Sequence, residues 1–192
     1  MAQPKPRMTP AEYLALERQA ETRSEFLDGE IFAMAGASAR HVRVCAALTA
    51  TLWNQLVDRP CDVLPTDMRV KIPATGLYTY PDVAVVCGEA EYDDAEHDTL
   101  LNPTLLIEVL SPPTADYDLG AKFGHYRTLP SLREVLYVAQ SEVHVLHYRR
   151  QSDGTWLLSE TRDPDAVVEL PSIGAELRLA QVYSKARLTA DR

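Results

Sequence analysis

Residues 103–111 have the sequence PTLLIEVLS, an apolar run of strand length that holds one acid, Glu108. Prolines interrupt the chain at both ends of the run, at Pro103 and Pro112. A short run of this kind is typical of a strand covered on both faces, as in the centre of a mixed or parallel sheet. An unpaired carboxylate in such a strand is costly. The run therefore predicts a central strand in which Glu108 has a cation or strong hydrogen-bond donors beside it.

A second acid of this kind, Asp82, stands at the start of the apolar strand expected in YPDVAVVC, residues 80–87. Two buried strands that each carry one carboxylate suggest a shared cation site where the strands lie side by side. Mg²⁺ suits such a site, because it takes oxygen ligands and typically binds one or two carboxylates together with a substrate phosphate. Lys122, on the helix expected after the Glu108 strand, would orient the attacking water or neutralise charge in the transition state.

The composition predicts an ordered globular protein whose overall charge does not favour nucleic acid. The chain has 192 residues, 46% of them hydrophobic, and 28 acidic against 19 basic residues give a net charge of −9. Affinity for nucleic acid comes largely from neutralisation of phosphates by Lys and Arg. The charge therefore argues against a tight nonspecific binder, although it leaves room for a local basic groove.

Several other properties follow from what the sequence lacks. Residues 1–10 contain no secretory signal and no run of 18 apolar residues occurs, so we expect a cytoplasmic protein without a membrane span. There is no P-loop and no glycine-rich dinucleotide fingerprint, so no nucleotide cofactor is expected. Cys45, Cys61 and Cys87 lie far apart in apolar segments without C-x-x-C spacing, which predicts three reduced core cysteines.

The order of apolar patterns and turn signals predicts an α/β fold, with a mixed sheet flanked by helices rather than a doubly wound repeat. Residues 1–8 are expected to form a flexible tail and residues 9–192 a single domain. The elements expected in chain order are a helix from Thr9 to about residue 22, a hairpin through Asp28-Gly29, a long helix from Ser38 to about residue 57, an extended segment at 61–72 with a bulge near 65–67, a strand from Asp82, a solvated acidic loop at 89–98, the Glu108 strand, a helix capped by Thr114, a strand at 134–139, a hairpin at 143–160, and short C-terminal strands with a last helical turn near 180–183.

Two short motifs resemble the signature of the PD-(D/E)XK nuclease superfamily: Pro81-Asp82 and, after an intervening loop, Ile107-Glu108-Val109. The chain is more closely similar to the small Uma-type endonucleases of bacteria. That resemblance rests on the sequences EFLDGE at 25–30, YPDV at 80–83 and IEVLSP at 107–112, followed by Asp118, Lys122 and Tyr126. It covers residues 9–148 approximately, and the joint spacing of the motifs is more specific than either acid motif alone.

The resemblance implies a restriction-endonuclease-like αβββαβ core, here with an added N-terminal helix and hairpin and with C-terminal β-hairpins. It also implies hydrolysis of nucleic-acid phosphodiester bonds, most of all in DNA, with Mg²⁺ or Mn²⁺ as the cofactor and a homodimer as the assembly.

By position, Asp82 and Glu108 match the metal-binding acids of the family. Glu25 or Glu30 matches its first acid, and His41 matches a residue that a helix carries to the site. One position departs from the superfamily, because Leu110 stands where its lysine is expected, two residues beyond the glutamate. We infer that Lys122 supplies the ammonium group instead.

Simpler interpretations of the same residues remain open at this stage. Asp82 after a proline is common as a turn-forming acid, and a buried salt bridge to Arg69 or Lys71 would explain Glu108 without catalysis. An i, i+4 pair of Asp118 and Lys122 is by default an exposed pair of little consequence.

Two other classes of protein compete with a nuclease. The first is a catalytically silent dimeric binding module with the same fold, which the acidic net charge and Leu110 favour. The second is a glycosidase with two carboxylates, which ranks last because Trp53 and Trp156 are expected in a helix and a hairpin core rather than on a sugar-binding platform.

Overall fold

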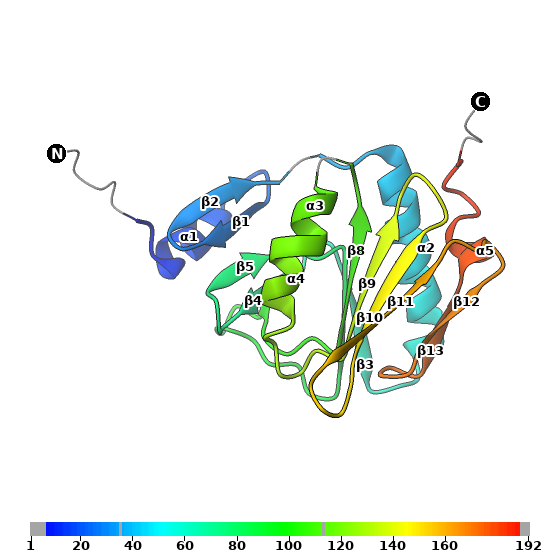
Figure 1. The fold of residues 1–192 in the computed structure, drawn as a ribbon. Coiled ribbons are helices and arrows are strands. Elements are labelled where there is room, and N and C mark those ends of the chain that lie inside the picture. The colour runs from blue at the N-terminus through cyan, green and yellow to red at the C-terminus, as the bar shows by residue number, and fades with distance from the viewer. Residues whose placement is uncertain (1–6, 35, 113, 189–192) are drawn as a thin grey trace.

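The computed structural model describes residues 7–34, 36–112 and 114–188. Its larger sheet has six strands in the order β11-β10-β9-β8-β6-β3 (Figure 1). Strands β8 and β9 run parallel, and every other neighbouring pair in this sheet is antiparallel. The bounds are β3 (Cys61–Pro65), β6 (Val83–Cys87), β8 (Leu105–Leu110), β9 (Glu134–Ala139), β10 (Val145–Arg150) and β11 (Trp156–Thr161). The predicted mixed sheet is confirmed, with the Glu108 strand β8 in its interior.

Helix α2 (Ala39–Leu56) covers one face of this sheet. The side chain of Ser38 caps it by accepting a hydrogen bond from the backbone N–H of His41 at 3.1 Å. Cys45, Leu48 and Leu52 are buried at the helical spacing that the sequence predicts, because they share one face of the helix. Figure 1 shows β12 (Val167–Leu170), β13 (Ala175–Arg178) and α5 (Leu179–Val182) on the same side, where they complete this part of the core.

A second helical segment covers the opposite face. It consists of α3 (Ala115–Tyr117), a π-helical turn η1 (Asp118–Lys122) and α4 (Phe123–Tyr126). The helix begins after Thr114 as expected, but the Thr114 side chain makes no capping hydrogen bond. In chain order, α2, β3, β6, β8, this segment and β9 give the predicted αβββαβ core.

The smaller sheet has five strands in the order β2-β1-β5-β4-β7. Its bounds are β1 (Ser24–Leu27), β2 (Glu30–Ala33), β4 (Arg69–Ile72), β5 (Leu77–Thr79) and β7 (Thr99–Leu100). The hairpin predicted at Asp28-Gly29 is confirmed, and both residues have positive φ angles, of 51° and 83°. Helix α1 (Pro10–Glu17), shorter than expected, packs Tyr13 against Phe26.

The prediction of one bulged strand at 61–72 is wrong. The chain leaves β3 after Pro65 and enters β4 at Arg69, so the two halves belong to different sheets. The change in apolar parity that suggested a bulge marks this crossing, because the two halves bury side chains in different cores.

The acidic loop at 89–98 is also not merely solvated. Asp93 lies 2.5 Å from Lys71, and Asp98 lies 2.9 Å from the buried Arg69. Asp94 pairs with Arg18 at 2.6 Å, which ties α1 to the loop. The positive partners stand far away in sequence, on α1 and β4, so the acidic composition of the segment alone did not reveal them.

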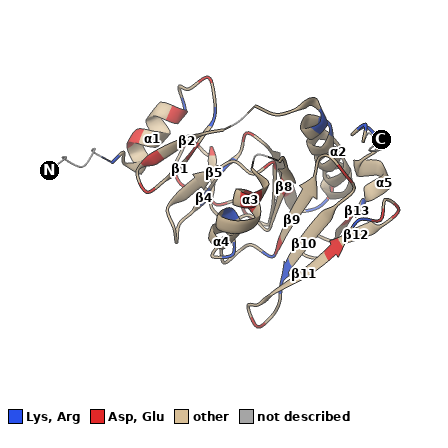
Figure 2. Cartoon of the chain, turned by 45° about the horizontal axis from the view of Figure 1, so that its top comes forward, with Lys and Arg blue, Asp and Glu red and all other residues tan. Residues whose placement is uncertain are grey.

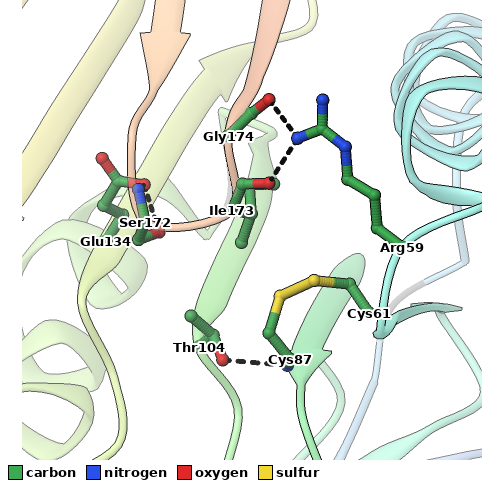
Figure 3. The surroundings of a disulfide bond; sticks show 8 residues. All are labelled: Arg59, Cys61, Cys87, Thr104, Glu134, Ser172, Ile173 and Gly174. Carbon is green, nitrogen blue, oxygen red and sulfur yellow. Dashed lines mark hydrogen bonds between the residues drawn. A yellow bond between two sulfur atoms is a disulfide. The ribbon is translucent and has the colours of Figure 1, made fainter.

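The expectation of three reduced cysteines is wrong for two of them. Cys61 and Cys87 lie directly opposite each other in the antiparallel β3–β6 register and form a disulfide, shown in Figure 3. They are 26 residues apart in sequence, and only the pairing of the strands brings them together. Cys45 is free and buried, as predicted.

The expected tail at 1–8 falls mostly on residues 1–6, which lie outside the described residues. Met8 is described, and its backbone N–H donates a hydrogen bond to the carbonyl of Gly29 at 3.2 Å. Met8 is thus part of the packed structure. Among the described residues, no helix has the length and apolar character needed to cross a membrane.

Candidate active site

Asp82 and Glu108 are brought together by the pairing of two neighbouring strands. In the antiparallel β6–β8 ladder, Val83 lies opposite Ile107. Continuing this register by one residue places Asp82 opposite Glu108. The two acids that the sequence singled out therefore lie at the same end of the larger sheet, and both line one cleft.

Asp82 is held by two hydrogen bonds. Its Oδ2 accepts a hydrogen bond from the backbone N–H of Val109 at 2.7 Å, and its Oδ1 lies 2.9 Å from His41 Nε2. The bond to the Asp82 carboxylate raises the pKa of His41, although partial burial of the imidazole acts in the opposite direction. His41, in the first turn of α2, thus reaches the site and orients Asp82.

Glu108 is buried, with 4% of its surface exposed, and its partner is Lys122 rather than Arg69 or Lys71. Its Oε1 lies 2.8 Å from Lys122 Nζ and also accepts a hydrogen bond from the Tyr126 hydroxyl. Burial raises the pKa of Glu108 to about 8, and the attraction of Lys122 opposes this only in part. Burial alone would lower the pKa of Lys122, but the carboxylate of Glu108 and the other acids outweigh it and raise the pKa well above its ordinary value.

Lys122 also contacts two further acids. Its Nζ lies 3.2 Å from Glu25 Oε1 and 3.5 Å from Asp118 Oδ1. Glu25 accepts additional hydrogen bonds from the hydroxyls of Thr79 and Tyr117. The ammonium group therefore points into the site, where it is shared by carboxylates from β1, β8 and its own helical turn.

The structure separates the two candidates for the first acid. Glu25 is buried on β1, between β2 and β5, whereas Glu30 lies exposed on the edge strand β2. Glu30 does not line the cleft. Its proposed supporting role is therefore corrected: the hairpin turn carries Glu30 away from the acids that surround Lys122.

The simpler interpretation of Asp118 and Lys122 as an exposed pair is wrong, because both side chains are buried. Both residues belong to the π-helical turn, and turns of this type inside α-helices are frequent at functional sites. Figure 2 shows acidic and basic ribbon adjoining in the segment labelled α3 and α4, where these residues lie.

The site residues line a cleft of about 1300 Å³ between β2, α2 and the helical segment after β8. Exposed apolar side chains from β2 and α2 also line it, including Phe32, Val42 and Trp53, the last with 55% of its surface exposed. Five acidic residues face two basic ones in the lining: Glu25, Asp67, Asp82, Glu108 and Asp118 against Arg23 and Lys122. This excess of negative charge favours a bound cation.

The donor atoms fit a hard divalent ion. Asp82 and Glu108 offer carboxylate oxygens, the ligands that Mg²⁺ and Mn²⁺ prefer. Glu108 Oε2 accepts no hydrogen bond from any residue that the structure describes, whereas Oε1 is fully engaged. The residues present therefore suit the expected metal.

Sequence reasoning gave no role to several residues that hold the acids. Tyr126 appeared only as part of the family motif, although it lies four residues after Lys122 and helical spacing could have placed it beside Glu108. Thr79 and Tyr117 carry no comparable signal. Thr79 contacts Glu25 only because β5 pairs with β1, and Tyr117 contacts it only because the helical segment meets the smaller sheet.

The mixed sheet, the acids Asp82 and Glu108 on neighbouring strands and the lysine beside Glu108 together match the arrangement that the sequence predicts for a nuclease. The chain belongs to the Uma2 family, described as "Putative restriction endonuclease", which matches residues 10–181.

Two relatives come from Synechocystis sp. (strain ATCC 27184 / PCC 6803 / Kazusa). The uncharacterized protein sll1609 is 41% identical over 162 residues, which cover 84% of this chain and 92% of that protein. The uncharacterized protein slr1290 is 34% identical over 180 residues, which cover 94% and 93%. A crystal structure described as a putative nuclease belonging to DUF820, from Anabaena variabilis ATCC 29413, has the same fold, with a TM-score of 0.76 at 20% identity and coverage of 93% and 99%.

Proposed function

We propose that the protein is a divalent-metal-dependent endonuclease that hydrolyses phosphodiester bonds of DNA, with a PD-(D/E)XK-type site. The observation that carries this proposal is the buried Lys122–Glu108 pair opposite Asp82 at the floor of an open cleft. Buried acids around one lysine are costly for stability alone, so their convergence in a cleft points to chemistry.

Asp82 and Glu108 would hold the metal. When bound, Mg²⁺ or Mn²⁺ supplies a Lewis acid that polarises a phosphoryl oxygen and acidifies a water molecule. His41 and the Val109 N–H fix the orientation of the Asp82 carboxylate, and Tyr126 fixes that of Glu108.

Lys122 would stabilise the charge that develops on the phosphoryl oxygens, or orient the attacking water. Its ammonium group is kept charged and in place by Glu25 and Asp118. Lys122 would thus replace the lysine that the superfamily has two residues after the glutamate, where this chain has Leu110. Lys122 comes from the helical segment that follows β8.

A cleavage assay on plasmid DNA and on single-stranded oligonucleotides, with Mg²⁺ or Mn²⁺, tests the proposal. We expect Asp82→Ala and Glu108→Ala to lower the rate by roughly a hundredfold or more, as loss of one electrostatic group at an active site typically does. Glu30→Gln is the matched control, because Glu30 is an exposed acid outside the cleft and its loss should leave the rate unchanged. Cleavage that survives both alanine substitutions would refute the proposed roles.

A catalytically silent binding module is the second candidate, and Leu110 is the observation that favours it. Thermal unfolding with and without Mn²⁺ separates the two. The nuclease should be stabilised by the ion, and Asp82→Ala or Glu108→Ala should abolish the gain, because only the folded site binds the metal. A silent module should show no such gain.

We also propose that the protein is a cytoplasmic homodimer. The edge strand β2 exposes Ile31 and Phe32, and the edge strand β11 exposes Leu157 and Leu158. Exposed apolar edge strands favour pairing with another chain. Sedimentation equilibrium should give twice the monomer mass of 21.4 kDa, and a purely monomeric species would contradict this assembly.

Cell fractionation tests the location. The protein should be found in the cytoplasmic fraction, and its presence in another fraction would contradict the proposed location.

A further inference from the structure

His41 and Cys45 lie four residues apart on α2, so they share one face of the helix. Both side chains face Asp82, which enters from the start of β6. One ligand atom from each residue, an imidazole nitrogen, a thiol sulfur and a carboxylate oxygen, lies within 4.8 Å of the other two. Of these atoms, His41 Nε2 lies 2.9 Å from Asp82 Oδ1.

This set of donors differs in kind from the acids around Lys122. Mg²⁺ takes oxygen ligands, whereas sulfur and imidazole nitrogen suit Zn²⁺ and related transition metals. Three protein ligands with a fourth position open to water is a common arrangement for bound zinc. We propose that His41, Cys45 and Asp82 form a separate site for a thiophilic divalent ion such as Zn²⁺ or Co²⁺.

Two features of the surroundings suit the site, the fixed orientation of Asp82 and the access to Cys45 from the cleft. The Val109 N–H holds Asp82 Oδ2 and leaves Oδ1 turned toward His41. Outer hydrogen bonds of this type orient metal ligands. Cys45 is free and has 7% of its surface exposed, and it lines the same cleft as His41 and Asp82, which gives an ion a path inward.

Binding requires small shifts of the ligand atoms and removes a hydrogen from two of them, the Cys45 sulfur and His41 Nε2. The hydrogen that His41 Nε2 shares with Asp82 Oδ1 moves to His41 Nδ1 or, from the imidazolium, passes to solvent. Bonds of about 2.0 Å to nitrogen and oxygen and about 2.3 Å to sulfur require the three ligand atoms to approach one another within roughly 4 Å. The sulfur binds as thiolate, so the thiol proton passes to solvent when the metal binds.

Asp82 belongs to both sites, which has a consequence that rests on the proposed function. An ion bound by His41 and Cys45 withdraws Asp82 Oδ1 from the hard-cation site at Asp82 and Glu108. Zn²⁺ should therefore inhibit the Mg²⁺-dependent reaction, and the inhibition should weaken as Mg²⁺ is raised.

Titration of the full-length protein with Co²⁺, without Mg²⁺ and in a non-thiol reductant, tests the site directly. The expected result is one Co²⁺ per chain with a near-ultraviolet thiolate-to-cobalt charge-transfer band and the visible bands of tetrahedral cobalt. Cys45→Ser should abolish the charge-transfer band, and His41→Ala should weaken Co²⁺ binding at least tenfold.

Two controls make the result specific. Glu108→Gln should retain the band, since Glu108 belongs only to the hard-cation site. The double variant C61S/C87S should also retain it, since the reductant can open that disulfide and expose other thiols. Circular dichroism without metal establishes that each variant is folded, and Cys45→Ala serves as a second variant if Cys45→Ser does not fold.

The site is overturned if the wild-type protein shows no charge-transfer band, or if the band persists in folded Cys45→Ser. A cobalt spectrum without a charge-transfer band also overturns it, because the ion is then held by oxygen ligands alone. The two proposals fail in different ways. A cobalt band without DNA cleavage in Mg²⁺ refutes the nuclease function and supports the site at His41 and Cys45. DNA cleavage in Mg²⁺ without a cobalt band refutes that site and supports the nuclease function.

Discussion

At the scale of single residues, the site buries more acidic groups than the single ammonium group of Lys122 can neutralise. Glu108 and Lys122 each have 4% of their surface exposed, and Glu25 and Asp118 complete a cluster with more carboxylates than ammonium groups. The cluster meets its excess negative charge by holding a proton or by binding a cation. The raised pKa of Glu108 corresponds to holding a proton, because burial favours the neutral form of the acid.

The titration of Glu108 should make stability depend on pH. The pKa of Glu108 is about 8 in the folded protein, above its ordinary value of 4.5. Between these pH values the unfolded chain has released the proton and the folded chain still holds it. The free energy of unfolding should therefore fall as pH rises through this window, by at most about 1.4 kcal/mol per pH unit.

Glu108→Gln removes this titration. Urea unfolding at a series of pH values from 5 to 8 should show the stability of the variant rising relative to wild type as pH increases. Parallel stability curves for the two proteins would show that Glu108 does not hold its proton in the fold.

Removing the cation of the cluster should be more damaging. Lys122→Met leaves buried carboxylates without their partner, and breaking a buried ion pair in this way typically costs about 3–5 kcal/mol. The loss should be larger at pH 8 than at pH 5, where the acids take up protons. Lys185→Met, a change at an exposed lysine, is the control in the same urea unfolding experiment. Equal stability of the two variants would contradict the account of the cluster.

At the scale of elements, the helical segment 115–126 delivers the lysine and two of the tyrosines. The π-helical turn at Asp118–Lys122 contains Lys122, which contacts the acids of β1 and β8, and Asp118, which contacts Lys122. Gly120 and Gly124 lie in the same segment, and neither has an atom within 4 Å of the position where a Cβ would stand. Glycine has a low intrinsic preference for helix, so these two residues weaken the segment. Its contacts at the site, through Lys122, help to hold it in place.

Gly124→Ala should stabilise the protein by roughly 0.5–1 kcal/mol, because alanine loses less backbone entropy than glycine on entering a helix. Gly29→Ala should do the opposite, since Gly29 has a φ of 83° and an added Cβ would lie 2.5 Å from the Cβ of Arg7. Urea unfolding of both variants measures the pair of effects. A destabilised Gly124→Ala would mean that the segment needs a conformation closed to alanine.

At the scale of the whole molecule, ion pairs join α1, the smaller sheet and the loop at 89–98. Arg69 is buried and contacts Asp98, which also pairs with Arg18 of the α1 C-terminus at 2.8 Å. These contacts hold α1 and β4 to the loop at 89–98, which leads into β7 of the same sheet. The same sheet carries Glu25 to Lys122, so the network supports the site from a distance.

This network should weaken in acid. The hydrogen bond from Arg18 holds the pKa of Asp98 well below its usual range, with Arg69 adding to the effect. A lowered pKa contributes stability that is complete above about pH 4 and is lost as pH falls through the folded value. Asp98→Asn should therefore lower the melting temperature most at pH 7, and the difference from wild type should shrink steadily as pH is lowered below about 4. A constant difference in melting temperature at all pH values would contradict the ionic origin of the effect.

Much of the fold and part of the site were predictable from local patterns. Period and turn chemistry located α2, the hairpin at Asp28-Gly29 and the strand around Glu108, because these depend on neighbours in sequence. The same reasoning singled out Asp82, Glu108 and Lys122, because a charged residue next to or within an apolar strand and a lysine in a predicted helix can be recognised from the sequence. It failed for Glu30, for the segment 61–72 and for the disulfide, where the outcome depends on which strands pair.

The sequence by itself determined that Glu108 would be buried in an apolar strand and that Asp82 would stand at the start of another, because the apolar residues of these strands are stable only when removed from water. Only the tertiary structure decided what stands beside those acids. Strand register placed Asp82 opposite Glu108, the π-helical turn brought Lys122 and Asp118 inward, and the first two turns of α2 carried His41 and Cys45 to Asp82. These contacts join segments far apart in the chain, and electrostatic energy depends on separation in space rather than in sequence.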